Sequence, residues 1–334
     1  MSRLVEVSGS AQKVLLERLY LPIAGELAQA EEILRAELRS KFPFVDELVR
    51  HSFRLGGKRL RPALVLLAAK ATGTVCHDHL VLAAVMEMIH TATLVHDDVL
   101  DQANLRRHLD TINARWGNES SVLLGDYLFT HSFYLASTLG TTYACQTIGK
   151  ATNIVCEGEL RQIASRGDYD LSEQAYLDII EAKTAELCSC CCRLGAHYAG
   201  AEAAVEESLA RFGRYLGIAF QIVDDLLDMQ GDEDTTGKSL GTDLEQRKPT
   251  LPLIRLLAQA DATQRGKIVA ALDADPCCPG ALDPWFDASD ALAYTRDKAR
   301  WFADQARAEL AQLPASDARA VLEVVAEFAI ERQH

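Results

Sequence analysis

Proline is absent from a long central part of the chain, and this absence limits what that part can fold into. None of the nine prolines falls within residues 63–248, although average usage of about 5% would place roughly nine there. Proline breaks helix interiors, so a segment without it favours long helices. Apolar residues in the segment recur at helical spacing, and no alternating strand pattern is present. We therefore expect an all-α fold.

The helical pattern divides into about a dozen segments. No repeat period or linker splits the chain, so we expect a single all-helical domain over residues 1–334, a bundle around a central cavity. Loops 54–62 and 231–250 are expected to line a site, whereas 272–285 is expected to be a connector. The predicted helices span 10–40, 44–53, 61–72, 78–103, 119–139, 143–165, 172–199, 202–229, 250–259, 263–273, 286–312 and 316–331.

One acidic pattern occurs twice, each time in apolar sequence, with carboxylates at i, i+1 and i+4. Like charges this close on a helix repel each other unless a cation lies between them. Mg²⁺ prefers carboxylate oxygens and usually keeps substrate phosphates as further ligands. Two such turns facing each other would hold Mg²⁺ around a diphosphate. The six residues are Asp97, Asp98 and Asp101 in the first copy and Asp224, Asp225 and Asp228 in the second.

The overall charge and composition exclude some classes of partner. The net charge of −14 argues against nucleic acid, whose binding requires a positive surface. Glu6 and Lys13 interrupt the N-terminal segment where a signal peptide would be apolar, and no apolar run is judged long enough to span a bilayer. We therefore expect a soluble cytoplasmic protein without stable membrane insertion.

Four of the nine cysteines lie together at positions 188, 190, 191 and 192, here called the cysteine cluster. No further histidine or cysteine pair lies nearby at zinc-site spacing, and on a helix the four side chains point in different directions. Free cysteine behaves as a small buried apolar residue. We expect the cluster to serve helix packing rather than to bind a metal.

Basic residues gather in two places despite the acidic balance. Lys58, Arg59 and Arg61 lie in the Gly-rich loop, and Arg106 and Arg107 follow the first acidic turn. Arginine can hold phosphate oxygens with two N–H groups at once. A single surface cation usually means nothing more than solvation, but the position of these residues beside an aspartate-rich turn favours diphosphate binding.

These motifs together resemble those of the trans-isoprenyl (polyprenyl) diphosphate synthases, in particular long-chain, octaprenyl-like members. The similarity extends over nearly the whole chain, through LGGKRLRP, EMIHTATLVHDDVLDQANLRR, Lys183-Thr184-Ala185, FQIVDDLLD and TGKSLGTDLEQRKPTLPLI. It implies the helical isoprenoid synthase fold and a prenyltransferase that condenses isopentenyl diphosphate head to tail with an allylic diphosphate primer. It also implies a homodimer that packs through helices around 120–165.

The resemblance implies a site for two diphosphates and three Mg²⁺ ions, with Mn²⁺ able to substitute. The six aspartates would hold the metal, chiefly through Asp224 on the second wall. Thr184 and Gln221 would place oxygens near the carbocation. The allylic diphosphate would contact Arg106, Lys183, Lys238 and Lys248, and isopentenyl diphosphate would contact Lys58, Arg61, His90 and Arg107.

Two of these residues also have plainer interpretations. Most histidines in apolar helices are core or surface residues, but His90 precedes Asp97 by seven positions and so shares its face. The Thr184 hydroxyl could simply bond to the preceding helical turn. His96, beside the acidic turn, is interpreted as structural.

Product length depends on the packing upstream of Asp97. The resemblance implies that a bulky aromatic there closes the pocket of short-chain enzymes, whereas Ala92 and Thr93 are small. We therefore expect a long all-trans product, hexaprenyl to decaprenyl, with a short-chain farnesyl or geranylgeranyl product as the alternative. The remaining chain-length candidates, which are equally consistent with plain core, are Ile89, Phe129, Phe133 and Leu135.

The chain departs from the family pattern at two loops. His108 and Asp110 stand where the family has glycine and proline, and Arg247 stands where glycine is common. We expect a different path for the loop after the first acidic turn. A terpene cyclase, a non-catalytic subunit of a heteromeric synthase and a structural helical bundle are the competing interpretations. Two intact acidic motifs argue against all three.

Overall fold

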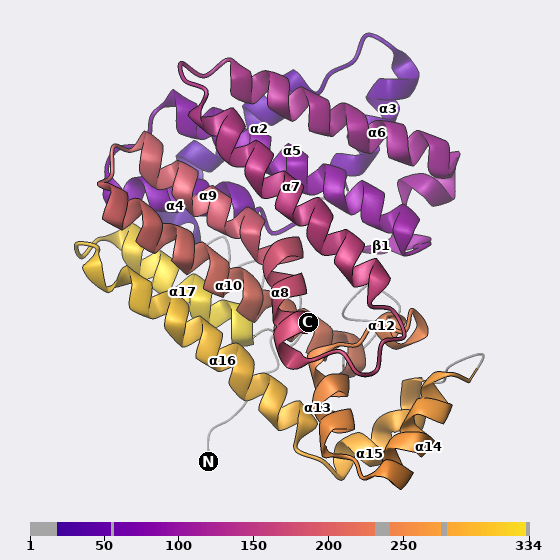
Figure 1. Cartoon of the computed structure of the whole chain (residues 1–334). Helices are drawn as coiled ribbons and strands as arrows, with labels where there is room; N and C mark the ends of the chain where they lie inside the picture. Colours follow the sequence, from indigo (N-terminus) through magenta and orange to yellow (C-terminus); the bar gives the residue numbers. More distant parts are fainter. Residues whose placement is uncertain (1–18, 55–56, 231–240, 275–278, 332–334) are drawn as a thin grey trace.

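The computed structural model describes residues 19–54, 57–230, 241–274 and 279–331. This part of the chain is almost entirely helical, which confirms the predicted all-α class (Figure 1). The helices are α2 (Ala24–Glu37), α3 (Pro43–Arg54), α4 (Leu60–Thr72), α5 (His77–Leu100), α6 (Ile112–Ser137), α7 (Tyr143–Ala164), α8 (Glu173–Ile180), α9 (Glu186–Tyr198), α10 (Ala203–Gln230), α12 (Thr242–Glu245), α13 (Leu251–Gln259), α14 (Ala262–Leu272), α15 (Asp283–Asp287), α16 (Ala291–Glu309) and α17 (Asp317–Glu331).

The short elements connect and interrupt these helices. A π-helical turn, η2 (Glu181–Ala185), separates α8 from α9, and a two-stranded antiparallel hairpin pairs β1 (Leu105–Arg106) with β2 (Leu109–Asp110). Three 3₁₀ turns complete the described chain: η1 (Leu21–Ile23), η3 (Pro279–Leu282) and η4 (Leu310–Gln312).

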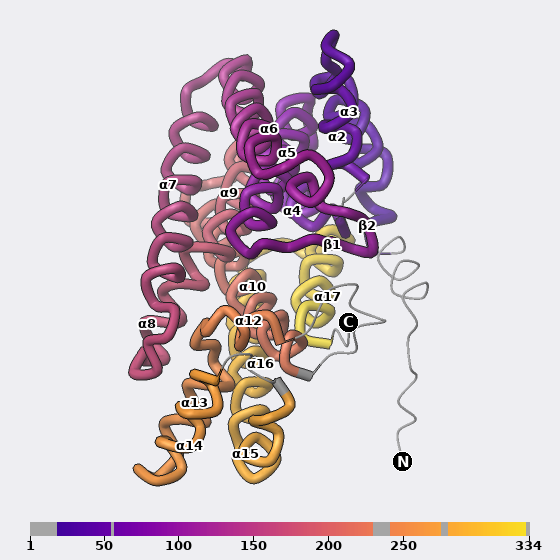
Figure 2. The backbone as a smooth tube through the Cα atoms, turned by 90° about the vertical axis from the view of Figure 1, so that its right-hand side faces the viewer, coloured from indigo at the N-terminus to yellow at the C-terminus, as the bar shows by residue number. Residues whose placement is uncertain are grey.

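The long helices form a bundle with a smaller group of helices at one end. Helices α5 and α6 pack along each other, α10 lies against α9 and α16, and α4 lies against α9. Figure 2 shows α13, α14 and α15 beyond the end of the bundle and the β1–β2 hairpin crossing the middle of the molecule. The main core draws on both halves of the chain, from α2 to α17.

Several predicted helix boundaries were wrong, each for a local reason. The predicted helix 10–40 is interrupted at η1, where Pro22 lies, and α2 begins at Ala24. The predicted helix 172–199 contains η2, and the predicted helix 286–312 is divided between α15 and α16. Helix α6 starts at Ile112, earlier than predicted, because the chain continues across a kink at Gly117, whose φ is 85°.

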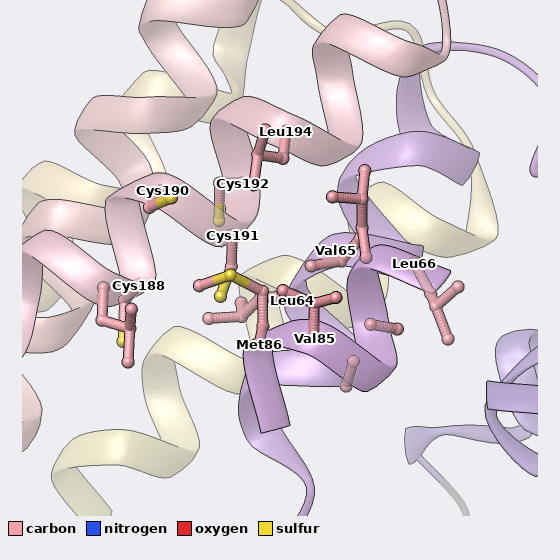
Figure 3. Packing of buried hydrophobic residues seen from close by; sticks show 14 of the residues in the cluster. Leu64, Val65, Leu66, Val85, Met86, Cys188, Cys190, Cys191, Cys192 and Leu194 are labelled. Atoms are coloured by element: carbon pink, nitrogen blue, oxygen red, sulfur yellow. The ribbon is translucent and has the colours of Figure 1, made fainter. Parts of the chain in front are cut away.

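The cysteine cluster is part of the hydrophobic core, as predicted. All four thiols are free and buried on α9, where they pack with residues of α4 and α5 (Figure 3). Small residues let the neighbouring helix come close: a Cβ built on Gly213 of α10 would lie 2.4 Å from the Cys188 carbonyl oxygen. Burial raises the pKa of Cys188 above its usual value, so the cluster favours the neutral thiol.

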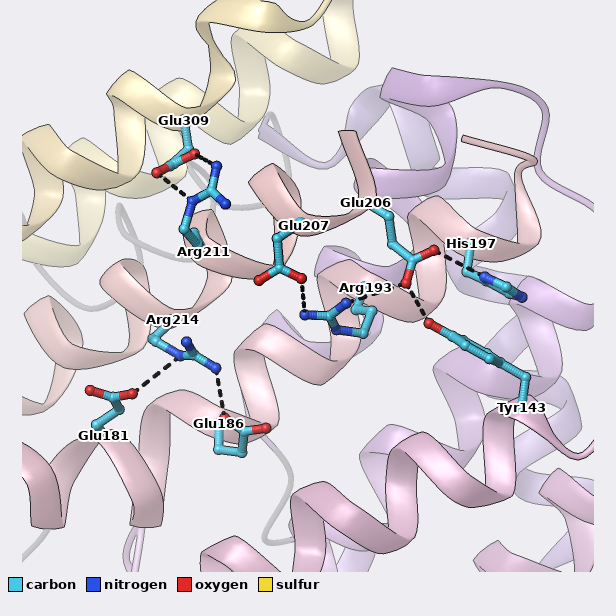
Figure 4. Close-up of polar contacts among 10 residues, drawn as sticks. All are labelled: Tyr143, Glu181, Glu186, Arg193, His197, Glu206, Glu207, Arg211, Arg214 and Glu309. Carbon is cyan, nitrogen blue, oxygen red and sulfur yellow. Dashed lines mark hydrogen bonds and ion pairs between the residues drawn. The ribbon is translucent and has the colours of Figure 1, made fainter. Parts of the chain in front are cut away.

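Ion pairs fasten the side of the bundle where α7, α9, α10 and α16 meet (Figure 4). Arg211 of α10 donates two hydrogen bonds, of 2.8 and 2.7 Å, to Glu309 of α16. Glu206 of α10 accepts from Tyr143 of α7 and lies 3.0 Å from His197 of α9. These contacts are partly exposed, so each is worth about 1 kcal/mol or less, and they orient helices that the core already holds together.

The prediction that no segment could span a bilayer needs one correction. Among the described residues, α5 is long and apolar enough to cross a membrane by length and composition. However, 78% of its most apolar 18-residue window is buried inside the molecule. Its hydrophobicity therefore serves the core, because its apolar faces are covered by α4, α6 and α9.

Candidate active site

The two acidic motifs lie at the ends of α5 and α10, and a segment from α12 to Pro249 joins them. Asp97 and Asp98 belong to the last turn of α5, and Asp101 is its C-cap. Lys248 Nζ lies 3.2 Å from Asp101 Oδ1 of the first motif and 3.5 Å from Asp243 Oδ1. Asp228 of the second motif accepts hydrogen bonds from the Thr242 hydroxyl and the Asp243 amide, both at 3.0 Å.

Asp98 forms an ion pair with Arg106. Arg106 Nε and Nη2 both lie 2.8 Å from Asp98 Oδ1, and the Asp98 side chain is 1% exposed. The β1–β2 hairpin places Arg106 there, because Arg106 pairs with Leu109 across a two-residue loop. The sequence analysis assigned Arg106 to the allylic diphosphate and Asp98 to the metal; the structure shows that the two side chains are also paired with each other.

The hairpin loop explains the departure at His108. Arg107 and His108 have φ values of 53° and 63°, the left-handed pair that a type I′ turn requires and that glycine adopts most easily. Arg247, the other departure from glycine, has φ of 55°. The chain therefore adopts at both positions a left-handed backbone that glycine would favour. Whether the loop after the first acidic turn follows a different path from that of other family members stays a prediction.

Lys183 and Thr184 enter the site from η2, a wide turn of the kind that often occurs at functional sites. Close helix contacts fix this turn: a Cβ on Gly158 of α7 would lie 2.6 Å from the Lys183 backbone nitrogen, and one on Gly217 of α10 would lie 2.5 Å from Ala185 Cα. Lys183 Nζ lies 2.7 Å from Glu159 and 2.6 Å from Gln162. Burial lowers the pKa of Lys183, but Asp97 and Glu159 outweigh it and raise the pKa overall.

Thr184 and Gln221, predicted to share the reacting region, are hydrogen-bonded to each other. Thr184 Oγ1 donates to Gln221 Oε1 at 2.8 Å, and Gln221 Nε2 donates to Asp225 Oδ1 at 2.8 Å. The other Asp225 oxygen accepts from the Tyr176 hydroxyl of α8 at 2.6 Å. Burial and the neighbouring Asp225 raise the pKa of Tyr176 well above its usual value, so its phenol remains a donor.

Burial makes carboxyls of both acidic motifs costly to ionise. Burial raises the pKa of Asp97 to about 6, although Lys183 counters it. Burial and Asp243 raise the pKa of Asp228 to about 6 and that of Asp225 to about 8. Such shifts show that ionising these carboxyls is costly without a further cation. The donor set therefore fits a hard divalent cation.

A small cavity lies beside α5 and the first acidic motif. Its lining includes Gly57, Glu87, His90, Asp98 and Arg106. His90 Nδ1 in this lining and the nearby Arg61 Nε are buried without a hydrogen-bond partner. Burial, followed by the charges of Arg61 and Arg107, lowers the pKa of His90 well below its usual value. A neutral histidine beside an arginine, Arg61, whose Nε–H has no acceptor is suited to a bound anion.

The Gly-rich loop contributes unequally to this pocket. Gly57 allows Arg107 to approach, because a Cβ on Gly57 would lie 2.8 Å from Arg107 Nη2. Lys58 Nζ lies 5.4 Å from the centre of the Phe328 ring of α17. Arg59 is structural, since it pairs with Glu87 of α5 and, at 3.2 Å, with Glu31 of α2. Lys238 lies outside the described residues.

The predicted chain-length residues lie on α5 and α6, and all but Thr93 belong to the main core or pack against it. Ile89 and Ala92 of α5 and Leu135 of α6 are buried, and the Phe129 and Phe133 rings of α6 are 5.2 Å apart. Thr93 is partly exposed, and its hydroxyl donates to the His90 carbonyl oxygen at 2.9 Å.

His96 is structural, as interpreted from the sequence. A Cβ on Gly125 of α6 would lie 2.1 Å from its Nε2, and that nitrogen lies 3.1 Å from the Val122 carbonyl oxygen. The ring therefore packs into the α5–α6 contact rather than facing the acidic turn.

Four partners of the predicted residues were not found from the sequence. These are Glu159 and Gln162 beside Lys183, Tyr176 beside Asp225, and Asp243 beside Asp228 and Lys248. Glu159, Gln162 and Tyr176 come from helices remote in sequence from the residues that they contact, whereas Asp243 precedes Lys248 by five residues. The GTDLEQRKPT motif, which already contained Asp243, held the only signal that reading the sequence could have used.

Comparisons with known proteins agree with this arrangement. The family model described as polyprenyl synthetase matches residues 42–287. The octaprenyl diphosphate synthase of Escherichia coli K12 is 36% identical over 320 residues, which cover 95% of this chain and 99% of that protein. Component 2 of the heptaprenyl diphosphate synthase of Geobacillus stearothermophilus is also 36% identical, over 96% and 99% of the two chains.

A solved structure of a relative has the same fold as this chain. The polyprenyl synthase of Caulobacter crescentus, crystallised with calcium and isoprenyl diphosphate, superposes with a TM-score of 0.90 and 36% identity. The match covers 96% of this chain and 98% of that one. By sequence and by structure, the chain belongs to the polyprenyl synthetase family of prenyltransferases.

Proposed function

We propose that this enzyme condenses isopentenyl diphosphate head to tail with an allylic diphosphate and releases a long-chain all-trans polyprenyl diphosphate. One observation carries the proposal: the buried nitrogens His90 Nδ1 and Arg61 Nε lack hydrogen-bond partners, and His90 lines a small cavity together with Arg106 and with Asp98 of the first acidic motif. A second anion site beside a cation site suits an enzyme that joins two diphosphates. A cyclase, which ionises a single diphosphate, has no use for it.

Mg²⁺ is the cation that this site suits best, with three ions per site and Mn²⁺ as a substitute. The aspartates of both motifs would hold it together with ligand phosphates, and it would supply charge that stabilises the departing diphosphate. In the described ranges, no three acidic, histidine or cysteine side chains converge closely enough to hold a metal ion by themselves. We propose that the two walls and a diphosphate share the coordination of the metal. The Caulobacter relative, crystallised with calcium, offers a precedent.

The cationic side chains would stabilise the same leaving group. Lys183 and Lys248 lie beside Asp97 and Asp101 respectively, and Lys238 is proposed to join them. Arg106 would act on the diphosphate while it orients Asp98. Fixed donors aimed at developing negative charge stabilise the transition state for breaking the carbon–oxygen bond.

Carbon–carbon bond formation requires a dry, oriented site. The isopentenyl double bond attacks the allylic cation, and a proton then leaves, most simply to the diphosphate that has just departed. Thr184 and Gln221 would place oxygens near the cation without donating a nucleophile of their own. Water must be excluded, because it would convert the cation to an alcohol.

We propose a product in the hexaprenyl to decaprenyl range, because Ala92 and Thr93 leave space along α5. Octaprenyl and heptaprenyl synthases among the relatives support this range. Ala92 is 1% exposed in the α5–α6 core, so a phenylalanine there would project into the space proposed for the growing chain. Ala92→Phe should therefore shorten the product, whereas an unchanged product length would refute the assignment of the pocket.

We also propose a homodimer formed through α6 and α7. These helices expose large apolar side chains in their middle and end portions, which a partner subunit would cover. The similarity to a heptaprenyl synthase component 2 makes a heteromeric assembly the second candidate. The exposed residues are Val122, Leu123, Tyr134, Leu160 and Ile163, with exposed fractions of 37% to 67%.

The deciding experiment is a product assay on the purified chain alone. Farnesyl diphosphate, labelled isopentenyl diphosphate and Mg²⁺ are supplied, and the dephosphorylated prenols are separated by chain length. A single long polyprenol is expected, with a dimer mass by light scattering. A product that stops at geranylgeranyl would refute the long-chain proposal, and a cyclic product would favour a cyclase. Turnover only after a second subunit is added would establish the heteromeric assembly.

A further inference from the structure

The hydrogen bonds behind the second acidic motif form a continuous chain across three elements. It runs from Thr184 of η2 to Gln221 and Asp225 of α10 and ends at Tyr176 of α8. Tyr176 is 4% exposed and Asp225 is 5% exposed. The phenol therefore lies behind the reacting region, and Asp225 and Gln221 separate it from the Thr184 hydroxyl.

Donor and acceptor roles along this chain follow from its Asp225 end. Both oxygens of the Asp225 carboxyl accept hydrogen bonds here. With one Asp225 oxygen taken by Tyr176 and the other by the Gln221 amide N–H, the carbonyl of Gln221 must face Thr184. The Thr184 hydroxyl then donates its hydrogen to that carbonyl. The lone pairs of the Thr184 oxygen can therefore face a developing cation.

On the basis of the function proposed above, we propose that Tyr176 is a positioning residue for the condensation. By fixing Asp225, it sets the orientation of the Gln221 amide and so keeps the Thr184 oxygen an acceptor toward the allylic cation. Without the phenol, one Asp225 oxygen loses its donor, and the carboxylate and the Gln221 amide can rotate. The Thr184 hydroxyl can then turn its proton toward the reacting carbon.

A small cavity lies next to the Tyr176 phenol, so Asp225 has room to move if its hydrogen bond to Tyr176 is lost. The cavity, of about 20 Å³, is lined by Tyr176, Gln221, Asp225, Lys183 and Thr250, and Thr250 Oγ1 is buried without a partner. This volume accommodates about one water molecule. If Tyr176 stops donating, a water molecule can enter this cavity and donate to Asp225, and it would then lie behind the reacting region.

The test compares Tyr176→Phe with Tyr294→Phe. Tyr294 of α16 is a matched control, because its hydroxyl also donates to a carboxylate, at 2.7 Å. That acceptor is Glu173 Oε2 of α8, the helix that carries Tyr176. For Tyr176→Phe we expect kcat to fall about tenfold, equal to about 1.4 kcal/mol, with the KM for isopentenyl diphosphate unchanged. We also expect a larger fraction of the primer to be released as alcohol. Tyr294→Phe should leave these quantities at wild-type values.

A double-mutant cycle with Thr184→Val decides whether the two residues act together. If the relay exists, the double variant loses no more kcat than the worse single variant. Multiplicative losses, or a Tyr176→Phe enzyme with wild-type kcat and alcohol release, overturn the proposal. Urea unfolding of the metal-free proteins provides a second readout, in which the relay predicts non-additive stability changes and additive changes count against it.

If wild type and Tyr294→Phe make no polyprenol, the proposed function fails, and the stability cycle on metal-free protein still decides the relay. If Tyr176→Phe does not fold, 3-fluorotyrosine at position 176 replaces it, since it keeps the ring and strengthens the donor. A changed kcat then supports the relay, and an unchanged kcat overturns it.

Discussion

Replacing Gly158 with alanine should separate an effect on activity from an effect on stability. A Cβ at this position would lie 2.6 Å from the Lys183 backbone nitrogen and 2.8 Å from Ala182 Cβ. Neither contact is with a flexible side chain, so α7 and η2 must move apart by about 0.8 Å to restore ordinary contact. Overpacking costs about 1–3 kcal/mol, while alanine regains about 1 kcal/mol of helix propensity. The net loss of stability should be about 0–2 kcal/mol.

The expected loss of catalytic rate in Gly158→Ala is larger than its loss of stability would suggest. A displacement near 1 Å of a catalytic group lowers the rate about a hundredfold, and Gly158→Ala displaces Lys183 and Thr184 together. The assay is steady-state elongation with labelled isopentenyl diphosphate, accompanied by urea unfolding. Gly266→Ala is the control, because Gly266 lies within α14 with no atom near its Cβ position; it should gain about 1 kcal/mol and keep wild-type kinetics. A Gly158→Ala enzyme within twofold of wild-type kcat/KM would refute the reasoning.

Three further predictions follow from strain, charge and burial. His108→Gly should stabilise the protein by about 0.5–1 kcal/mol in urea unfolding, since it relieves a left-handed residue; a loss of stability would contradict the turn assignment. In metal-free protein, the raised pKa values of Asp97 (about 6) and Asp225 (about 8) contribute stability that is complete below their unfolded values and lost as pH rises through the folded ones. Mg²⁺ should therefore raise Tm more at pH about 8.5 than at pH about 5, and an equal shift at both would count against these carboxyls as its ligands. Maleimide should label exposed Cys76 in native protein and reach the cysteine cluster only in denaturant, as peptide mapping would show.

Much of the fold was accessible from the sequence because its signals are local. The proline-free stretch and the helical spacing of apolar residues correctly indicated an all-α chain. The predicted and observed limits of the helix near 251–259 and of the helix near 262–272 agree within a residue or two. The breaks were less accessible. Pro22 marks η1, but η2 has no marker of its own, because a π turn is stabilised by what packs against it.

The sequence by itself determined the helical class and picked out the candidate groups: two groups of three aspartates and a basic loop, recognisable from spacing along the chain, with the Lys183-Thr184 step added by the family resemblance. Only the tertiary structure decided how their charges are shared. It paired Asp98 with Arg106 and Asp101 with Lys248, and it gave Asp225 to Tyr176. Spacing fixes which side chains share a face of one helix, whereas a partner on another helix depends on how closely the backbones approach. Here that approach is set by glycines, such as Gly158 and Gly217, whose missing side chains leave little trace in a hydrophobic pattern.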